Sequence, residues 1–333
     1  MANTITLGIL GTFPSEYQMI NFNQLRTFCQ AAKHGSYTTA AKKLYVTQPA
    51  VTAQMKLLED HCNLKLFKKK GRKVYLTDEG KTLYQYARKI FDYEKEIEDV
   101  VQDMRKLKRG VLRLGTTKTY ARYFMPLMIT NFRETYPHIQ IHLDEGSSKN
   151  MTLSLLDFQN EIAIIAKTEE HPDVCFFPFS KEEVVLIAAP DHHLAGKSPT
   201  TFEYISKEPI IMKEIGSGTR KLVNNIFAKY NCMPVMLMET SNTEFIKQLV
   251  QRGDGISFLV KEAVAVELRD GKLATVPLQG HRLFLDISVA YLKDQHLSPP
   301  AKAFLDILGK LAPEEMLPQG IGALMAKMLS QRR

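Results

Sequence analysis

Apolar side chains recur every seven residues through one segment in the first third of the chain, and no proline interrupts it. The two rows of this repeat, offset by three positions, are Leu83, Ile90, Ile97 and Met104, and Tyr86, Tyr93, Val100 and Leu107. Heptad spacing predicts one helix over residues 78–109, with Thr77 as N-cap and Gly110 as the stop. Such a helix is roughly 45 Å long, longer than a small domain needs. It divides the chain into a head and a body, and we expect it to pair with the same helix of a second subunit. The alternative is that the stripe packs on its own chain.

The head, residues 19–77, carries the apolar spacing and the capping residues of three short helices. In order, these are Asn21 or Asn23 before Leu25, Phe28, Ala31 and Ala32; Ser36 before Ala40, Ala41 and Leu44; and Thr47 before Val51, Met55 and Leu58. Tyr45 and Val46 form the turn between the second and third helices. Pro49 stands in the first turn of the third helix, where its missing N–H costs no hydrogen bond. Together these features predict a helix-turn-helix.

The outer face of the third helix suits contact with the major groove of DNA. The side chains left outside the apolar face are Gln48, Ala50, Thr52, Gln54 and Lys56. A glutamine pairs with adenine edges, and the apolar faces of Pro49 and Thr52 match a thymine methyl group. The polar face therefore predicts base contacts.

Positive charge is concentrated in the head. The chain carries +8 in total, whereas residues 22–91 contain fourteen Lys and Arg against four Asp and Glu, which leaves −2 for the rest. Residues 66–76 place five of these cations around Gly71, which suits the tip of a two-stranded hairpin. A charge run alone is as often a solvated face, but directly after a helix-turn-helix it points to phosphate contacts.

These residues resemble the N-terminal domain of LysR-type transcriptional regulators. The matching pattern is Phe28…Ala40-Ala41…Thr47-Gln48-Pro49-Ala50-Val51-Thr52…Gln54…Leu58-Glu59…Leu66-Phe67…Arg72…Leu76-Thr77…Gly80. The resemblance implies a winged helix-turn-helix whose DNA contacts would be Thr47, Gln48, Pro49, Thr52, Gln54, Lys56, Lys70 and Arg72. It also implies a homodimer or homotetramer on a dyad-like operator in double-stranded DNA, with RNA polymerase as a further partner.

Two positions depart from the family pattern. Asn63 stands where a glycine usually follows the third helix, and asparagine is the next best residue for a left-handed C-cap. Lys69 stands where the wing usually carries arginine, so the charge is kept and the bidentate fork is lost.

After Val111 the pattern changes to short apolar strands that alternate with helical segments. The predicted strands are 111–114, 139–143, 162–166, 184–189, 210–212, 256–260 and 285–290, and the predicted helices are 124–132, 222–229, 245–251 and 301–311. This alternation predicts an α/β fold with mainly parallel sheets. Ligands of such folds bind beyond the carboxyl ends of strands, close to helix N-termini.

Three loops at such strand ends are rich in hydroxyls and glycine: residues 115–119, 145–150 and 216–220. Hydroxyls and free backbone N–H groups at helix starts form an anion site. The alternative for each loop is that its Ser and Thr are only helix caps. Three loops of this kind at corresponding strand ends favour a binding cleft.

The resemblance to LysR-type regulators continues to about Leu311. It implies a periplasmic-binding-protein-like effector domain over 110–312, with one subdomain at 111–178 and 285–311 and the other at 179–284. The loop at 116–123 is similar to that of cysteine-biosynthesis regulators, which implies a sulfate-like anion or an acylated serine. The loop at 216–220 is similar instead to that of relatives governing carbon fixation or sulfite use. Both imply a small anionic effector, with ligand residues Thr116, Thr117, Thr119, Ser147, Ser148, Ser217, Gly218 and Thr219.

The sequence gives little support to other classes of protein. It contains no GxSxG, HExxH or P-loop motif, so neither an enzyme nor a solute-binding protein is expected. His192 and His193 are expected in a solvated loop, and no metal or cofactor site is predicted. A redox-sensing regulator of the same family is the remaining alternative, because Cys175 and Cys232 lie in the sensing region.

The two ends of the chain and the location of the protein are predicted from composition. No apolar run approaches the ~20 residues that a membrane span needs. Residues 1–18 contain no Lys or Arg and make a poor signal peptide, so we expect a cytoplasmic protein. Residues 1–18 are expected to be a disordered extension, or to precede a true start at Met19. Residues 313–333 form a tail whose apolar residues could line one helical face, and which would pack on the body, contact another subunit or remain mobile.

Overall fold

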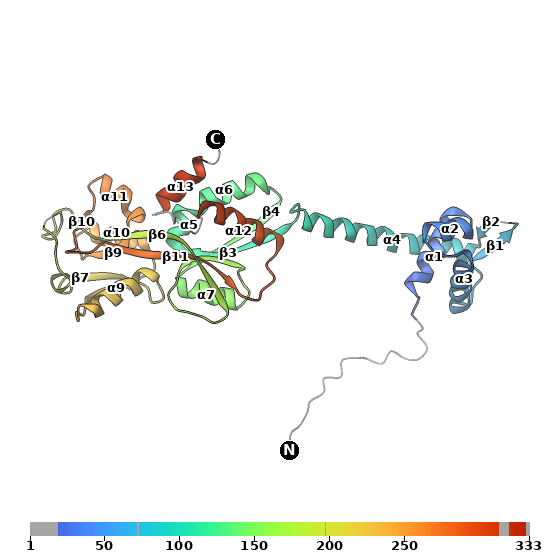
Figure 1. Ribbon diagram of the computed structural model, residues 1–333, viewed down its shortest axis with the longest axis horizontal. Coiled ribbons are helices and arrows are strands. Elements are labelled where there is room, and N and C mark those ends of the chain that lie inside the picture. Colours follow the sequence, from blue (N-terminus) through green and yellow to red (C-terminus); the bar gives the residue numbers. More distant parts are fainter. Residues whose placement is uncertain (1–18, 72, 197, 313–319, 331–333) are drawn as a thin grey trace, which may run out of the picture. The chain divides into compact units, whose positions relative to one another are not determined.

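The computed structural model describes residues 19–71, 73–196, 198–312 and 320–330 of the 333 (Figure 1). The expectations for residues 1–18, for Arg72 and for residues 313–319 therefore lie outside the described residues. The chain divides into two compact units, Met1–Gln102 and Asp103–Arg333.

The first unit is a three-helix domain with a hairpin and a long helix. Its elements are α1 (Phe22–His34), α2 (Tyr37–Lys43), α3 (Gln48–Cys62), β1 (Phe67–Lys70), β2 (Lys73–Leu76) and α4 (Asp78–Arg105). The predicted caps are confirmed, because the side chains of Asn21, Ser36 and Thr47 each accept a backbone N–H from the first turn of the following helix. Asn63 ends α3 in the left-handed conformation, at φ 49°.

The core of this unit joins the three helices to the hairpin and to the start of α4. Its buried members include Leu25, Phe28, Ala31, Ala40, Ala41, Val51, Met55, Leu58, Leu66, Val74 and Ala87. Phe28 also packs its ring against Phe67, with centroids 5.3 Å apart. The apolar face predicted for each helix is therefore the face that is buried.

Helix α4 keeps the middle of its heptad stripe exposed. The uncovered members are Tyr86, Ile90, Tyr93, Ile97 and Met104, whereas Leu83 and Leu107, at the two ends, pack partly on the cores of their own units and Val100 is half-buried. A stripe that its own chain leaves open matches the seam of a coiled coil. The pairing itself stays a prediction.

The end of α4 differs from the prediction. The helix ends at Arg105, and Leu107 adopts the left-handed conformation at φ 56°. The N–H of Lys108 donates to the carbonyl of Asp103, and the N–H of Leu107 to that of Met104. These two bonds form a Schellman motif, so the helix stops without glycine. Gly110, the predicted stop, is instead the first residue of a strand.

The second unit is a mixed α/β domain. Its strands are β3 (Gly110–Thr117), β4 (Ile139–Gly146), β5 (Ile162–Ala166), β6 (Val174–Ala188), β7 (Pro209–Lys213), β8 (Val235–Thr240), β9 (Ser257–Val260), β10 (Ala274–Val276) and β11 (Leu283–Leu292). Its helices are α5 (Lys118–Tyr123), α6 (Met125–Thr135), α7 (Ser148–Leu156), α8 (Phe202–Ile205), α9 (Gly218–Lys229), α10 (Thr243–Gln251), the 3₁₀ turn η1 (Lys261–Val264), α11 (Ala265–Arg269), α12 (Pro299–Leu311) and α13 (Ile321–Ser330).

The prediction of mainly parallel sheets is wrong. The main sheet has the order β10-β6-β11-β5-β3-β4, with β9 also paired to β6. Among the strand pairs of the described residues, β3 with β4, β3 with β5 and β7 with β8 run parallel, and every pair made by β6 or β11 is antiparallel. Strands β6 and β11 are long and pair with each other from Val174 to Val184, so they run through both halves of the domain. The first half of β6 was not predicted.

Two cores lie at the two ends of these long strands. One packs β3, β5, α5, α6 and α12 around Phe124, Phe132, Phe179 and Phe304, and the other packs β6, β7, β9, α8 and α9 around Phe202, Phe227 and Phe258. Two cores joined by two strands make the domain two subdomains, as the sequence predicts.

The described part of the tail packs on the first of these cores. Helix α13 buries Ile321, Leu324 and Met328 there, and Figure 1 shows it beside α6 and α12. The Gly320 N–H donates to the carbonyl of Lys181 at 2.8 Å. Of the three alternatives for the tail, packing on the body holds for these residues. Among the described residues, no helix is both long enough and apolar enough to cross a membrane.

Candidate functional site

The exposed face of α3 presents the polar residues that the sequence singled out. Gln48 and Pro49 are exposed at its N-terminus, above the buried Val51. The Nε2 of Gln48 donates to Thr52 Oγ1 at 2.9 Å, and this hydroxyl donates to the Gln48 carbonyl at 3.2 Å. The two side chains are thus held together on one turn of the helix.

Other predicted residues of α3 are less available. The Thr47 oxygen caps the helix by accepting the Ala50 N–H at 3.4 Å. Gln54 is half-buried, and its Oε1 has no hydrogen-bond partner among the described residues. Lys56 is exposed. Gln54 therefore belongs partly to the interior, whereas Lys56 can reach outward.

The predicted wing is present as the β1–β2 hairpin. Gly71 turns between the strands at φ +61°, and no described residue beyond its chain neighbours comes within 4 Å of where a Cβ would stand. Lys68, Lys69 and Lys70 are exposed, and the Lys69 ammonium lies 5.4 Å from the centre of the Tyr37 ring. Of the two predicted wing contacts, Arg72 lies outside the described residues, and Lys70 lies exposed at the end of β1.

A small pocket in the second unit gathers the three predicted loops. It is lined by Thr117, Thr119, Ser147, Ser148, Ser217, Gly218 and Thr219, and by Lys118, Tyr120, Glu182, Lys213 and Glu214. Thr116 is different: its side chain is fully buried and its hydroxyl donates to the Ile164 carbonyl at 2.9 Å. It secures β3 to β5 and does not line the pocket. The other predicted ligand residues are brought together.

Several hydroxyls in this pocket do not cap a helix, so the alternative that the loops hold only helix caps does not account for them. Thr117 and Ser217 stand at the N-cap positions of α5 and α9, but neither makes a side-chain cap bond. Ser148 Oγ is buried with no partner among the described residues. Ser147 does cap its helix, accepting the Asn150 N–H at 3.1 Å. A buried hydroxyl without a partner is costly, so a ligand is the natural acceptor or donor for it.

Two lysines that the sequence analysis missed supply positive charge. Lys118 Nζ donates to Ser241 Oγ at 2.7 Å, and Lys213 Nζ donates to the Ser241 carbonyl at 2.8 Å. Burial, together with the charge of Lys118, lowers the pKa of Lys213. Lys213 Nζ also lies 3.8 Å from the Glu214 carboxylate, whereas Lys118 has no ion-pair partner among the described residues. The Lys118 ammonium and the free hydroxyls around one cavity suit an anion. The sequence did hold one sign of this role for Lys213, because that residue directly follows the strand predicted at 210–212.

A buried carboxylate also faces this pocket. Glu182 is fully buried, and its Oε1 accepts hydrogen bonds from the Tyr120 and Ser180 hydroxyls. Its Oε2 accepts the Ile321 N–H at the start of α13, at 3.1 Å. Burial, and then the Glu182 charge, hold the pKa of Tyr120 well above its ordinary value, so the phenol stays a donor. The pocket wall is thereby bonded to the C-terminal helix, which no sequence pattern indicated.

The pocket is closed between the two subdomains. The Lys149 N–H donates to the Gly216 carbonyl at 3.1 Å, and Arg122 pairs with Glu244 at 2.8 Å. The cavity measures about 40 Å³. A cavity needs about 10–15 Å³ of such volume to hold one water, so the space between these contacts is that of a few waters.

The cysteines do not form a pair in this structure. All four are free, and Cys175 and Cys232 lie on different elements, β6 and the turn after α9. Burial raises the pKa of Cys29 to about 11 and also raises that of Cys62. Both thiols are therefore less reactive than an ordinary cysteine.

The comparisons with known proteins cover both units. Residues 22–81 match the model of the bacterial regulatory helix-turn-helix protein, lysR family, and residues 105–313 match the LysR substrate binding domain. The HTH-type transcriptional activator CmpR of Synechocystis is 34% identical over 86% of this chain and 94% of its own length. The RuBisCO operon transcriptional regulator of Allochromatium vinosum is 30% identical over 87% of this chain and 95% of its own.

A solved structure extends the comparison to the pocket-bearing unit. The regulatory domain of Synechocystis CcmR in complex with 2-PG is 30% identical, with a TM-score of 0.56, over 60% of this chain and 96% of that one. These relatives are of the CmpR and RuBisCO-operon type. The similarity to cysteine-biosynthesis regulators is thus not what these comparisons show. This chain belongs to the LysR family of DNA-binding transcriptional regulators and carries that family's effector-binding domain.

Proposed function

We propose that this regulator senses a small anionic metabolite in the closed pocket between its subdomains. The observation that carries the proposal is Ser148 Oγ, a buried hydroxyl without a described partner, in a cavity that also holds Lys118 and Lys213. The ligand contacts would be Thr117, Thr119, Ser147, Ser148, Ser217, Gly218 and Thr219. Thr116 drops out of the predicted set because its hydroxyl is bonded within the sheet.

The ligand class that we favour is a phosphorylated small carboxylate. The CcmR domain is described in complex with 2-PG, and the pocket here offers hydroxyls and two ammonium groups to such an anion. A sulfate-like anion or an acylated serine, which the loop at residues 116–123 suggests, is the alternative. The carboxylate of Glu182 requires a donor group on any ligand that approaches it.

The head would read DNA through α3 and the wing. We assign base contacts to Gln48, Pro49 and Thr52, with Gln54 and Lys56 at the edge of that surface, and phosphate contacts to Thr47, Lys70 and Arg72. A dyad-like operator requires two heads. The exposed stripe on α4 supports pairing of two such helices in a homodimer, from which a tetramer could be built.

In this proposal residues 19–77 bind DNA, 78–109 link and pair subunits, and 110–312 bind the effector, with subdomains at 111–178 plus 285–311 and at 179–284. Effector binding shifts the balance between a closed and an open domain, and this balance changes how the subunits present their heads. RNA polymerase as a partner and a cytoplasmic location rest on the family and on the need to meet DNA.

The effector part is tested by a thermal-shift panel on the intact protein. The probes are 2-PG, phosphoglycerates, inorganic phosphate, sulfate, thiosulfate and acylated serine, because a ligand of the folded state alone raises the unfolding midpoint. Thr117→Val should abolish the shift produced by the active probe and leave DNA binding without effector intact. Thr130→Val, an equally shaped change at an exposed site on α6, should keep the shift. A normal thermal shift in Thr117→Val would exclude the loop at residues 115–119 from the ligand site.

The DNA part is tested by the salt dependence of operator binding. Each phosphate contact contributes a slope of about 0.9 in log K against log salt. Lys70→Ala should lower the slope by about that amount and weaken binding to specific and random DNA alike. Lys95→Ala removes the same charge from an exposed position on α4 and should leave the slope unchanged. Equal slopes for the Lys70 variant and the unaltered protein would exclude Lys70 from the interface.

A further inference from the structure

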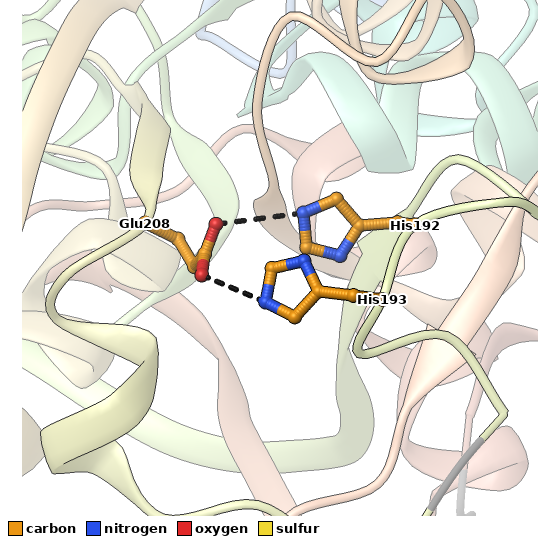
Figure 2. Close-up of side chains that lie close together, drawn as sticks. All are labelled: His192, His193 and Glu208. Carbon is orange, nitrogen blue, oxygen red and sulfur yellow. Dashed lines mark ion pairs between the residues drawn. The ribbon is translucent and has the colours of Figure 1, made fainter.

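His192, His193 and Glu208 converge at a point that the regulatory proposal does not use (Figure 2). The histidines lie in the turn after β6, and Glu208 comes immediately before β7. His193 Nε2 is 3.0 Å from Glu208 Oε1, and His192 Nε2 is 3.5 Å from Glu208 Oε2. Among the described residues, only these three bring His, Cys, Asp or Glu ligand atoms together in a group, all within 4.8 Å. Sequence reasoning placed the two histidines in a solvated loop and found no partner for them.

The backbone around this cluster is held in place. The His192 N–H donates to the Ala189 carbonyl at 3.1 Å, and the Glu208 N–H donates to the Ile205 carbonyl at 3.1 Å. The His192 and Glu208 side chains are 14% and 20% exposed, whereas that of His193 is 62% exposed. The His192 and Glu208 side chains are thus largely buried, and the His193 side chain lies on the solvent side of the cluster.

The charges at the cluster suit a cation. The ion-pair partners of Glu208 in the described part of the chain are these two imidazoles and no lysine or arginine. The adjacent Asp191 adds a second negative charge near the His192 ring. Carboxylates at this point favour the positive charge of a metal ion.

We propose that His192, His193 and Glu208 form a binding site for a divalent transition-metal cation of the Zn²⁺ class. Zn²⁺ binds imidazole nitrogen and carboxylate oxygen at ~2.0–2.2 Å, so neighbouring ligand atoms of a tetrahedral ion lie about 3.3 Å apart. The His193 and His192 Nε2 atoms lie 3.0 and 3.5 Å from the two different oxygens of Glu208, and the three ligand atoms lie within 4.8 Å of one another. Small side-chain rotations from this arrangement bring them to that spacing.

The donor set determines which cations fit. Two imidazoles and one carboxylate select Zn²⁺, Ni²⁺ or Cu²⁺ over Mg²⁺ and Ca²⁺, which prefer oxygen ligands. Water completes the fourth position on the open side. Binding at Nε2 moves the His192 ring proton to Nδ1, so the 3.3 Å contact in which Nδ1 accepts the Leu194 N–H is given up.

The site is tested by calorimetric titration of ZnCl₂ into intact, tag-free protein that has been stripped with EDTA. We compare the unaltered chain with His193→Ala, Glu208→Gln and a control, His171→Ala, which alters a histidine 3.8 Å from Asp173 elsewhere in the same unit. The unaltered chain and the control should bind one equivalent. The two site variants should lose more than about tenfold in affinity, since even outer-shell changes cost roughly 10–100-fold.

The outcomes are decisive because His193 is exposed and its loss leaves the core intact, which circular dichroism of each variant verifies. Absence of Zn²⁺ binding by the unaltered chain overturns the proposal. So does equal affinity in all four proteins, because the ion would then sit elsewhere, for example on cysteines. Titration with MgCl₂ should show no binding at this site, and a Mg²⁺ affinity equal to that for Zn²⁺ would contradict the assigned class.

Discussion

The proposed DNA-reading surface and the proposed effector pocket are built in opposite ways. On α3, the functional side chains point outward from one helix, and the residues beneath them, Val51, Met55 and Leu58, are buried. In the pocket, the functional groups are themselves buried or half-buried, and they come from the ends of several strands that are far apart in sequence. The first surface needs only a rigid support, whereas the second needs the whole domain to be assembled.

The difference sets how each region can fail. A change beneath α3 acts through the stability of the head, because the reading residues make few contacts of their own. A change in the pocket acts at the point where the subdomains touch, because Gly216 and Lys149 are already bonded across the cleft. The head is therefore sensitive to lost packing and the pocket to added bulk.

The largest expected effect is loss of packing beneath the reading surface. Leu58→Ala should destabilise the head by about 2–5 kcal/mol, the usual cost of truncating a buried leucine. Its neighbour Leu57 is 55% exposed, so Leu57→Ala should change stability by no more than about 0.5 kcal/mol. Hydrogen exchange measured by mass spectrometry on the intact chain reports α1 to α3 separately from the effector domain. Similar protection of α1 to α3 from hydrogen exchange in the two variants would contradict the expectation that packing beneath α3 stabilises the head.

Added bulk in the pocket should have the next largest effect. A Cβ on Gly218 would lie 2.4 Å from the Ala166 Cβ, so Gly218→Ala forces the pocket wall to move. Overpacking costs about 1–3 kcal/mol, which is roughly 5–150-fold in affinity for the active probe. Gly309→Ala, where nothing lies within 4 Å, is the matched control. Titration of both variants with that probe tests this, and an unchanged affinity in Gly218→Ala would show that the wall is not tight.

The same contrast explains what the sequence could predict. Helix caps such as Asn21, Ser36 and Thr47 act on residues no more than three positions away, so the local sequence pattern was sufficient to predict the three helices of the head. In the pocket, the hydroxyl loops were found because they follow apolar strands. Glu182 and Lys213 were missed, because their role depends on partners in distant elements, such as Ile321 and Ser241.

Two errors have specific physical causes. Thr116 looked like a ligand residue because it stands in a threonine-rich loop, but strand alternation turns its hydroxyl into the sheet, toward the Ile164 carbonyl. The end of α4 was placed at Gly110 because glycine is the usual residue in the left-handed conformation. Leu107 takes that conformation instead, since two backbone bonds and packing of its side chain on the neighbouring core compensate for the strain.

The smallest expected effect is a pH dependence confined to the head. Burial raises the pKa of Glu59, but hydrogen bonds from Lys65 and from the N–H groups of Leu66 and Phe67 outweigh it and lower the pKa below 4.5. A carboxylate with a lowered folded-state pKa stabilises the fold above its unfolded-state pKa, and this contribution is lost as the pH falls through the folded-state pKa. Glu59 joins the end of α3 to the wing through those bonds.

Glu59→Gln should therefore reduce the protection of the head's backbone amides from hydrogen exchange at pH 7. The difference in protection between this variant and the unaltered chain should shrink as the pH falls below about 4. Hydrogen exchange, corrected for the intrinsic rate at each pH, measures it. A difference that stays constant with pH would mean that shape, and not charge, makes Glu59 the link between the reading helix and the wing.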